Sequence, residues 1–231
     1  LVWLARPNTI SPWARRRLHL NHHKFSGSEY DLEERGISNG MPWGLRRLLV
    51  ISDQLMSVYI RPFQMLKMMA QFKEKQPENE RKKAVIEQLT GFIPLSFVIY
   101  HLVNGVAPLL GQSINWSVAL VKAMPTINFL AVIWIIPNFI RSFCLQFISS
   151  NMHYYGDIDP RDVIKQTQVL NPWWLFPFQL FCFNFGSTHA IHHFVVKEPF
   201  YVRHLTSKTA HKVMREVGVR FNDIGTFKRT N

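Results

Sequence analysis

Two short histidine-rich stretches are the part of this sequence whose residue types and spacing could do chemistry. Residues 19–23 read HLNHH and residues 189–193 read HAIHH, so both follow the pattern H-x-x-H-H. Positions i, i+3 and i+4 lie close together on one face of an α-helix. If both stretches are helical, each presents three imidazoles together. Neutral imidazole binds iron, zinc, copper and nickel well, so the repeated pattern predicts a metal site.

The expected metal ligands are seven histidines. They are His19, His22, His23, His153, His189, His192 and His193. Seven imidazoles exceed the four ligands of a structural zinc site, and they suit two metal ions that each keep an open position. Imidazole-rich sites with open positions fit iron and O₂ chemistry. We do not expect His101, His204 or His211 to be ligands, because none of them belongs to a matching cluster.

Carboxylates near the clusters are candidates for orienting the ligands. A carboxylate that accepts the second N–H of a ligating histidine fixes the tautomer of that ring. We expect Asp157 to do so. The other nearby carboxylates are Glu29, Asp31, Glu33, Glu34 and Asp159. The alternative for all six is that they balance arginines and cap helices.

Two long stretches without Lys, Arg, Asp or Glu predict a membrane hairpin. They cover residues 91–114 and 124–140, and the second continues to residue 148 after Arg141. Each is about long enough to cross a ~30 Å hydrocarbon layer. Lys and Arg are dense before the first run and after the second, which places both flanks in the cytoplasm and the joint opposite. The alternative is a pair of buried helices in a soluble helical protein.

The expected fold is all-α: an integral membrane helical protein with a cytoplasmic, histidine-rich di-metal cap. We treat residues 1–231 as one domain, with the hairpin at 91–148 and mainly cytoplasmic or interfacial segments at 1–90 and 149–231. A third apolar run, residues 169–186, is expected to be interfacial or re-entrant, with Trp173 and Trp174 at headgroup level. A third crossing is the alternative, but it would separate the two histidine clusters.

The net charge indicates which kinds of partner the protein could bind. The formal net charge of +12 over 231 residues favours an anionic partner such as nucleic acid, anionic lipid or a phosphate-bearing substrate. We expect no nucleic acid, because the charge-free runs would have no purpose and no aromatic residues are interleaved with the basic patches. Anionic headgroups or a phosphate-bearing acyl carrier would instead meet Arg15, Arg16, Arg17, Arg46 and Arg47. The alternative is that these arginines only reflect the excess of Lys and Arg in cytoplasmic segments of membrane proteins.

Two other classes of site are disfavoured. The two cysteines, Cys144 and Cys182, lie in apolar runs, so we expect no disulfide. A membrane metal transporter would place histidines midway through its crossings, and only His101 is there. We expect His101 to be a hydrogen-bonded helix residue or a pore-facing group.

Together these residues resemble the membrane fatty acid desaturase family and its related hydroxylases. HLNHH is similar to the family's second histidine box and HAIHH to its third, and His153 lies where the family often has one further ligand. The resemblance implies a non-haem di-iron centre with O₂ as co-substrate and a lipid or acyl substrate. It also implies a multi-pass membrane protein whose active site faces the cytoplasm, and a separate electron donor of the ferredoxin, rubredoxin or cytochrome b5 type.

The resemblance implies an O₂-dependent desaturase that introduces a double bond into a fatty acyl chain. The alternative is a di-iron membrane hydroxylase acting on alkyl chains or a related lipid, because NMHYYG is similar to the N-x-x-x-H-Y-G motif of alkane hydroxylases with its histidine displaced. No first histidine box precedes His19, so we expect the chain to be truncated at its N-terminus. An acyl tunnel could use Trp43, Met56, Tyr59, Phe63, Met65 and Met68, although ordinary packing is the simpler explanation for each.

Overall fold

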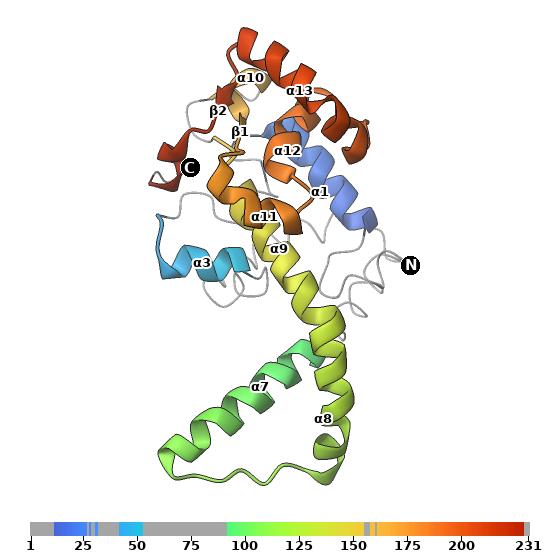
Figure 1. Ribbon diagram of the computed structural model, residues 1–231, viewed down its shortest axis with the longest axis vertical. Coiled ribbons are helices and arrows are strands. Elements are labelled where there is room, and N and C mark those ends of the chain that lie inside the picture. The colour runs from blue at the N-terminus through green and yellow to red at the C-terminus, as the bar shows by residue number, and fades with distance from the viewer. Residues whose placement is uncertain are drawn as a thin grey trace. The chain divides into compact units, whose positions relative to one another are not determined.

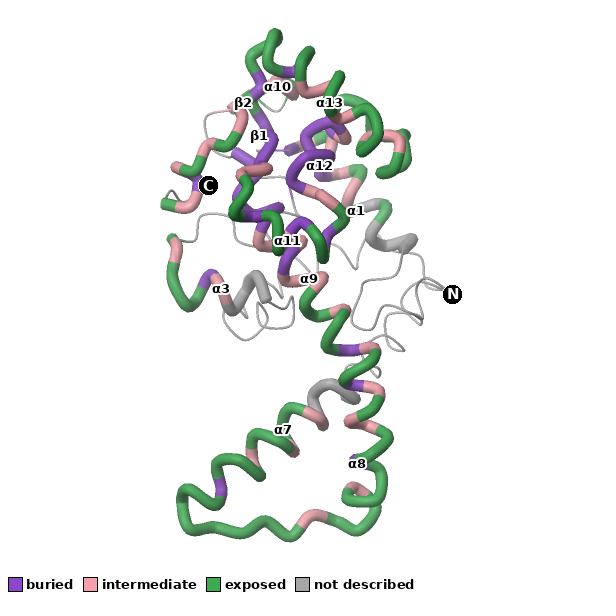
Figure 2. Tube along the Cα trace, in the orientation of Figure 1, coloured by how far each residue is buried: buried purple, intermediate pink, exposed green. Residues whose placement is uncertain are grey.

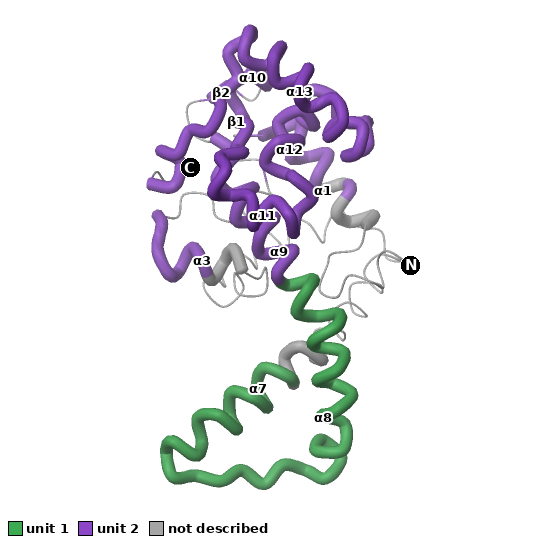
Figure 3. The backbone as a smooth tube through the Cα atoms, in the orientation of Figure 1, with its two compact units in different colours: residues 1–15, 75–139 green, residues 16–74, 140–231 purple. Residues whose placement is uncertain are grey.

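The computed structural model is mostly helical, and it forms two compact units (Figures 1 and 3). It describes residues 12–26, 28, 31, 42–52, 92–154, 158–159 and 161–228. The first unit comprises residues 1–15 and 75–139, and the second comprises residues 16–74 and 140–231. The histidine clusters lie in the second unit, and most of the long apolar sequence lies in the first.

Apart from the first residues of α1 (Pro12–Phe25), the described residues of the first unit form apolar helices. They are α7 (Phe92–Val106), the short 3₁₀ helix η1 (Ala107–Leu110), α8 (Val118–Leu130) and the π-helical turn η2 (Ala131–Ile135). The Ser117 side chain accepts a hydrogen bond from the Leu120 N–H and so caps α8. His101 Nε2 lies 2.7 Å from Asn128 Oδ1, which joins α7 to α8. His101 is therefore a hydrogen-bonded helix residue, as expected.

One helix is long and apolar enough to cross a membrane. Helix α8, the turn η2 and helix α9 (Ile136–Ser149) continue without a break over the 32 residues Val118–Ser149, whose most apolar 18-residue window has a mean hydropathy of 1.9. Only 17% of its most apolar window is buried, unlike the core helix of a soluble protein (Figure 2). Within the described residues the other apolar helix, Phe97–Leu110, is shorter than a span. The expected crossing at residues 124–148 therefore lies in a helix long enough to span a membrane. The expected crossing at residues 91–114 stays a prediction.

The second unit surrounds the end of α9 with short elements. These are α1 (Pro12–Phe25, whose first residues belong to the first unit), α3 (Leu45–Ser52), α10 (Val163–Gln166), β1 (Gln168–Val169), η3 (Trp173–Leu175), α11 (Phe176–Phe181), α12 (Phe185–Phe194), α13 (Phe200–Glu216), β2 (Arg220–Phe221) and η4 (Ile224–Phe227). Strands β1 and β2 pair in parallel, with Gln168 opposite Arg220. This two-residue ladder and a single bridge between His153 and Thr167 are the described departures from an all-α fold.

Two small apolar cores fix the elements that carry the histidines. In one, Cys144, Ile148 and Met152 at the end of α9 pack with Leu170, Leu175 and Cys182. Both cysteines are free, as the sequence predicts. In the other, Ala190 and Ile191 of α12 pack against β1 and α13 through Val169, Met214 and Val219. Helix α12 is thus held between a strand and a long helix.

Gly186 fixes the start of α12. Its N–H donates to Gln179 Oε1 and its carbonyl accepts from the Leu170 N–H, each at 3.0 Å. A Cβ at this position would overlap the Leu170 carbonyl oxygen and the Gln179 amide nitrogen. Only glycine permits this approach, and the approach sets where the following histidines point.

Two sequence expectations near α3 concern Arg47 and Trp43. Arg47 is buried, its guanidinium donates to the Ser150 carbonyl at 3.0 Å, and it lies over the Trp43 ring. The expectation that Arg47 meets lipid headgroups or an acyl carrier is therefore wrong, because its guanidinium is buried against Ser150 and Trp43. Trp43 packs on Phe147 and Phe227, as the packing explanation predicts. The other proposed tunnel residues, Met56, Tyr59, Phe63, Met65 and Met68, lie outside the described residues.

Candidate metal centre

Both histidine stretches are helical, as their spacing predicts. His19, His22 and His23 lie near the end of α1, and His189, His192 and His193 lie on α12. His153 follows α9 in a short extended segment that makes a single bridge to Thr167. Three separate elements therefore deliver the seven imidazoles to one region of the second unit.

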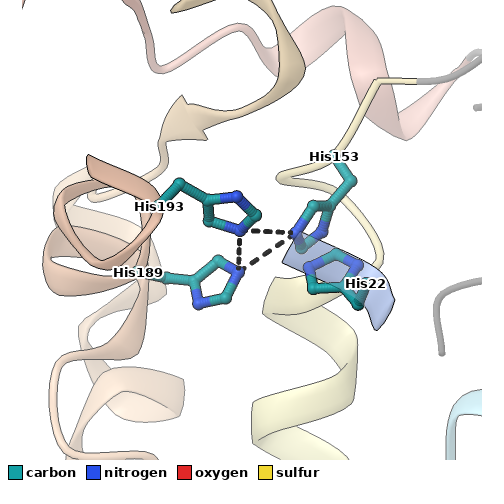
Figure 4. Close-up of side chains that lie close together, drawn as sticks. All are labelled: His22, His153, His189 and His193. Atoms are coloured by element: carbon teal, nitrogen blue, oxygen red, sulfur yellow. Dashed lines mark hydrogen bonds between the residues drawn. The ribbon is translucent and has the colours of Figure 1, made fainter. Parts of the chain in front are cut away.

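Four buried histidines form the first cluster (Figure 4). His22, His153, His189 and His193 each offer a ring nitrogen, and these four atoms lie within 4.8 Å of one another. The Nε2 atom of His189 lies 3.0 Å from that of His153 and 3.1 Å from that of His193. The Nε2 atoms of His153 and His193 are 3.4 Å apart. The rings therefore converge on a common point through their Nε2 atoms.

Three partly buried histidines form the second cluster. His19 Nε2 lies 2.9 Å from His192 Nε2 and 3.1 Å from His23 Nε2, and the last pair, His23 and His192, is 2.9 Å apart. The two clusters adjoin each other, since the ring centroids of His23 and His193 are 4.7 Å apart. The arrangement is that of two neighbouring sites, one with four imidazoles and one with three.

Each H-x-x-H-H motif contributes to both clusters. On α1, His19 and His23 join the second cluster and His22 joins the first. On α12 the first and last histidines join the first cluster, and His192 joins the second. The helix turns about 100° per residue, so i and i+4 point about 40° apart while i+3 points about 100° from i+4. The middle histidine of each motif is thereby turned towards the neighbouring site.

Two hydrogen bonds orient rings of the first cluster. Asp31 Oδ2 lies 2.8 Å from His22 Nδ1, and both side chains are buried. The Ser149 carbonyl oxygen lies 3.0 Å from His153 Nδ1. Both acceptors favour the proton on Nδ1, which leaves the Nε2 lone pair facing the cluster. These two rings are thus held in the tautomer that a metal ion needs.

Burial keeps three of the histidines neutral. Desolvation, followed by the charge of neighbouring histidines, lowers the pKa of His189 and His193 well below the ordinary value of 6.5. Desolvation and the nearby Arg203 cation lower the pKa of His192 to about 3. Neutral imidazole is the form that ligates metal, so these side chains are in the correct protonation state at neutral pH.

The donor set fits metal ions. Each neutral Nε2 is either a hydrogen-bond donor or an acceptor, so three mutually close Nε2 atoms must include at least one pair of the same kind. A cation removes this conflict by accepting a lone pair from all three. Metal–imidazole bonds of about 2.0–2.1 Å separate two nitrogens by about 3.0 Å at a right angle and about 3.4 Å at a tetrahedral angle. The spacings of 2.9–3.4 Å fall in that range.

Comparison with known proteins identifies the family. The family profile described as fatty acid desaturase matches residues 1–225. The chain belongs to the fatty acid desaturase family. Searches of the curated proteins and of the solved structures returned no match. Family membership makes the protein an oxidoreductase of the desaturase and hydroxylase type, associated with membranes, and the family is known for di-iron centres.

One residue near the site has a role that the sequence did not single out. We expected Asp157 to orient a ligand, but Asp157 lies outside the described residues, and Asp31 makes that contact. Asp159 pairs with the exposed Arg161. His204 contacts Asn184, and His211 contacts the Ser187 carbonyl. The signal for Asp31 was its position eight residues after a histidine motif, which alone does not distinguish it from its acidic neighbours.

Proposed function

We propose that this protein is an O₂-dependent membrane desaturase that introduces a double bond into a fatty acyl chain. The observation that carries the proposal is the pair of adjoining imidazole clusters in a chain of the desaturase family. His22, His153, His189 and His193 would hold one iron ion, and His19, His23 and His192 would hold the other. Bound iron would supply the O₂ chemistry that removes hydrogen from an unactivated C–H bond.

The reaction needs an external reductant. Desaturation converts –CH₂–CH₂–, O₂, two electrons and two protons into –CH=CH– and two waters. In line with the family, the electrons would come from a separate donor of the ferredoxin, rubredoxin or cytochrome b5 type.

The protein's own side chains prepare the site. Asp31 and the Ser149 carbonyl fix two ring tautomers, and burial holds His189 and His193 neutral. The first cluster is buried and the second is partly open. We infer that the more open cluster is the side from which O₂ and the acyl chain approach, since it has fewer protein ligands and more access.

Iron analysis with lipid profiling tests the proposal. The gene is expressed in a host fed a saturated acyl chain. We expect about two irons per chain and new unsaturated products, both reduced in His22→Ala and His192→Ala. His101→Ala is the matched control, because His101 lies in the apolar helices and bonds to Asn128. It should retain iron and product, whereas a metal transporter would fail with it.

Other outcomes reassign the function. Two irons with hydroxylated products would identify the hydroxylase, whose reaction inserts one oxygen atom and releases a single water. Absence of iron, or one zinc ion per chain, would show that the two clusters do not build a di-iron centre.

A further inference from the structure

The outer side of α11 and the start of α13 form an exposed apolar surface in the second unit. We call it the α11–α13 surface. Its exposed side chains are Trp173, Phe176, Leu180, Phe183, Phe200, Tyr201 and Leu205. Five of them, Trp173, Phe176, Leu180, Phe183 and Phe200, line one open groove of about 530 Å³. The side chains are therefore contiguous, whereas exposed apolar residues on a soluble monomer are usually scattered.

Except for Gln179, whose buried amide bonds to Leu170 and Gly186, helix α11 is apolar on both of its faces. Inward, Phe178 stacks on Phe147 with ring centroids 4.7 Å apart, and it packs against the core at the end of α9. Outward, Phe176 and Leu180 remain more than 60% exposed. A helix that is apolar all round belongs in a protein core or in lipid. No described residue covers the outer face.

Backbone strain adds to the exposure at the end of α11. Phe183 and the next residue, Asn184, both have φ of 55°, in the left-handed region. Asparagine tolerates this conformation, but a bulky aromatic residue rarely adopts it. The conformation turns the Phe183 ring outward, 61% exposed, against Phe200. Insertion into lipid would remove the exposed Phe183 ring from water.

The charges around the surface complement an anionic leaflet. From residue 163 to residue 215, Glu198 is the one acidic residue. The neighbouring exposed cations are Lys197 and Lys208. Aromatic side chains bordered by Lys and Arg are typical of segments that lie in the membrane interface. The surface also continues from a lipid-facing element, since α11 packs on the last turns of the spanning helix Val118–Ser149.

We propose that the α11–α13 surface inserts into the headgroup and acyl layer of the bilayer, with lipid acyl chains entering its groove. The second unit would then be held on the membrane by its own contacts as well as by the spanning helix. Neither the metal ions nor the reaction is needed for this attachment, so it can be tested even if the proposed function fails.

Spin-label depth measurements on the whole protein in anionic phospholipid vesicles test the proposal. Labels are placed by Leu180→Cys and Leu205→Cys in a Cys144→Ser, Cys182→Ala background. Lys212→Cys is the matched control, because it lies two turns after Leu205 on the same face of α13. We expect the two leucine positions to be several-fold more accessible to O₂ than to a water-soluble nickel complex. The order should reverse at the control position.

Two results would overturn the proposal. Nickel access at Leu180 equal to that at Lys212 would mean that the surface stays in water. Protection from both O₂ and nickel would mean that protein, such as a second copy or the electron donor, covers it.

A second measurement avoids any effect of the labels. Photoactivatable phospholipid should cross-link to the groove, and Leu180→Glu should reduce the adducts several-fold. Val213→Glu, at an exposed apolar residue on α13 away from the groove, should leave them unchanged. Iron content or the unfolding transition shows that both variants are folded. Equal adducts in the two variants would refute the insertion of the groove.

Discussion

Replacing Asp31 changes how the His22 ring is oriented and leaves all seven histidines in place. Asp31→Asn keeps an oxygen that can accept from His22 Nδ1, but it loses the charge that makes the ring a stronger donor to metal. We expect metal affinity at the first cluster to fall about 10–100-fold. Titration against a competing chelator measures this. Asp159→Asn is the control, because its carboxylate pairs with Arg161 at the surface. Equal affinities in the two variants would contradict the orienting role.

The lowered pKa values of His189, His192 and His193 predict acid sensitivity of the metal-free protein. Above pH 6.5 these imidazoles are neutral in both the folded and unfolded states. Below it the unfolded chain binds protons that the folded protein does not, so stability is lost as pH falls from 6.5 towards 3. Each of the two fully buried rings can contribute up to about 1.4 kcal/mol per pH unit.

Chemical unfolding of the metal-free protein at several pH values measures this loss. Replacing His189 and His193 together by Gln should flatten the dependence between pH 6.5 and 5. Metal ions bind the neutral rings and should move the loss to lower pH. An unchanged slope in the double variant would show that other groups carry the acid sensitivity.

At the residue scale, the sequence identified the seven histidines that the structure brings together, and their role as metal ligands stays a prediction. The contacts of the charged residues could not be predicted in this way. A repeated motif with helical spacing is local information, so the seven imidazoles could be named from the sequence. Whether Arg47 faces lipid or the Ser150 carbonyl, and whether Asp31 or Asp157 meets a ligand, depends on contacts between distant segments. No spacing rule contains those contacts.

Among the elements, α12 positions the most ligands, and Gly186 positions α12. Gly186→Ala would force the Cβ against the Leu170 carbonyl, so the helix must shift. We expect a loss of about 1–3 kcal/mol in unfolding free energy, together with weaker metal binding. Gly105→Ala in α7 is the control, because a Cβ there meets nothing within 4 Å. It should be neutral or stabilising by up to about 1 kcal/mol. Equal free energies of unfolding in the two variants would refute the close approach of Gly186 to the Leu170 carbonyl.

The exchange of histidines between α1 and α12 predicts which substitutions share a phenotype. His19→Ala and His192→Ala, on different helices, should both lose the metal of the second cluster. His22→Ala and His189→Ala should both weaken the first. Metal content near one per chain, with spectra that match within each pair, would establish this. His204→Ala is the control and should keep both metals. If His19→Ala instead matched His22→Ala, and His189→Ala matched His192→Ala, each helix would serve one metal. That result would contradict the sharing of histidines between the two clusters.

The elements themselves were predicted more reliably than their partners. Helical spacing and charge-free runs identified α1, α12 and the spanning helix. The same runs did not show that Ser117 caps a helix beginning at Val118, which makes the joint before it shorter than expected. Nor did they show that a glycine contact would decide how α12 lies.

For the whole molecule, the contact between the two histidine motifs constrains the membrane topology. His19 and His192 lie 2.9 Å apart, yet the spanning helix Val118–Ser149 separates them in sequence. A single crossing would leave them on opposite sides of the bilayer. His153, which follows this helix directly, also lies beside His22. If Val118–Ser149 crosses, we therefore predict an odd number of further crossings between residues 26 and 117. The apolar segment at 91–114 is the candidate, which agrees with the hairpin expected from the distribution of Lys and Arg.

Cysteine labelling in intact cells tests this hairpin. In a Cys144→Ser, Cys182→Ala background, Gln112→Cys lies in the joint between α7 and α8, and Lys228→Cys lies near the end of the second unit. Both positions are exposed. A membrane-impermeant maleimide should label Gln112→Cys directly and Lys228→Cys only after permeabilisation, because the predicted hairpin places both basic flanks in the cytoplasm. Labelling of neither before permeabilisation would place the joint on the cytoplasmic side. The segment at 91–114 would then not cross, and the contact between His19 and His192 would require another crossing or no crossing by Val118–Ser149.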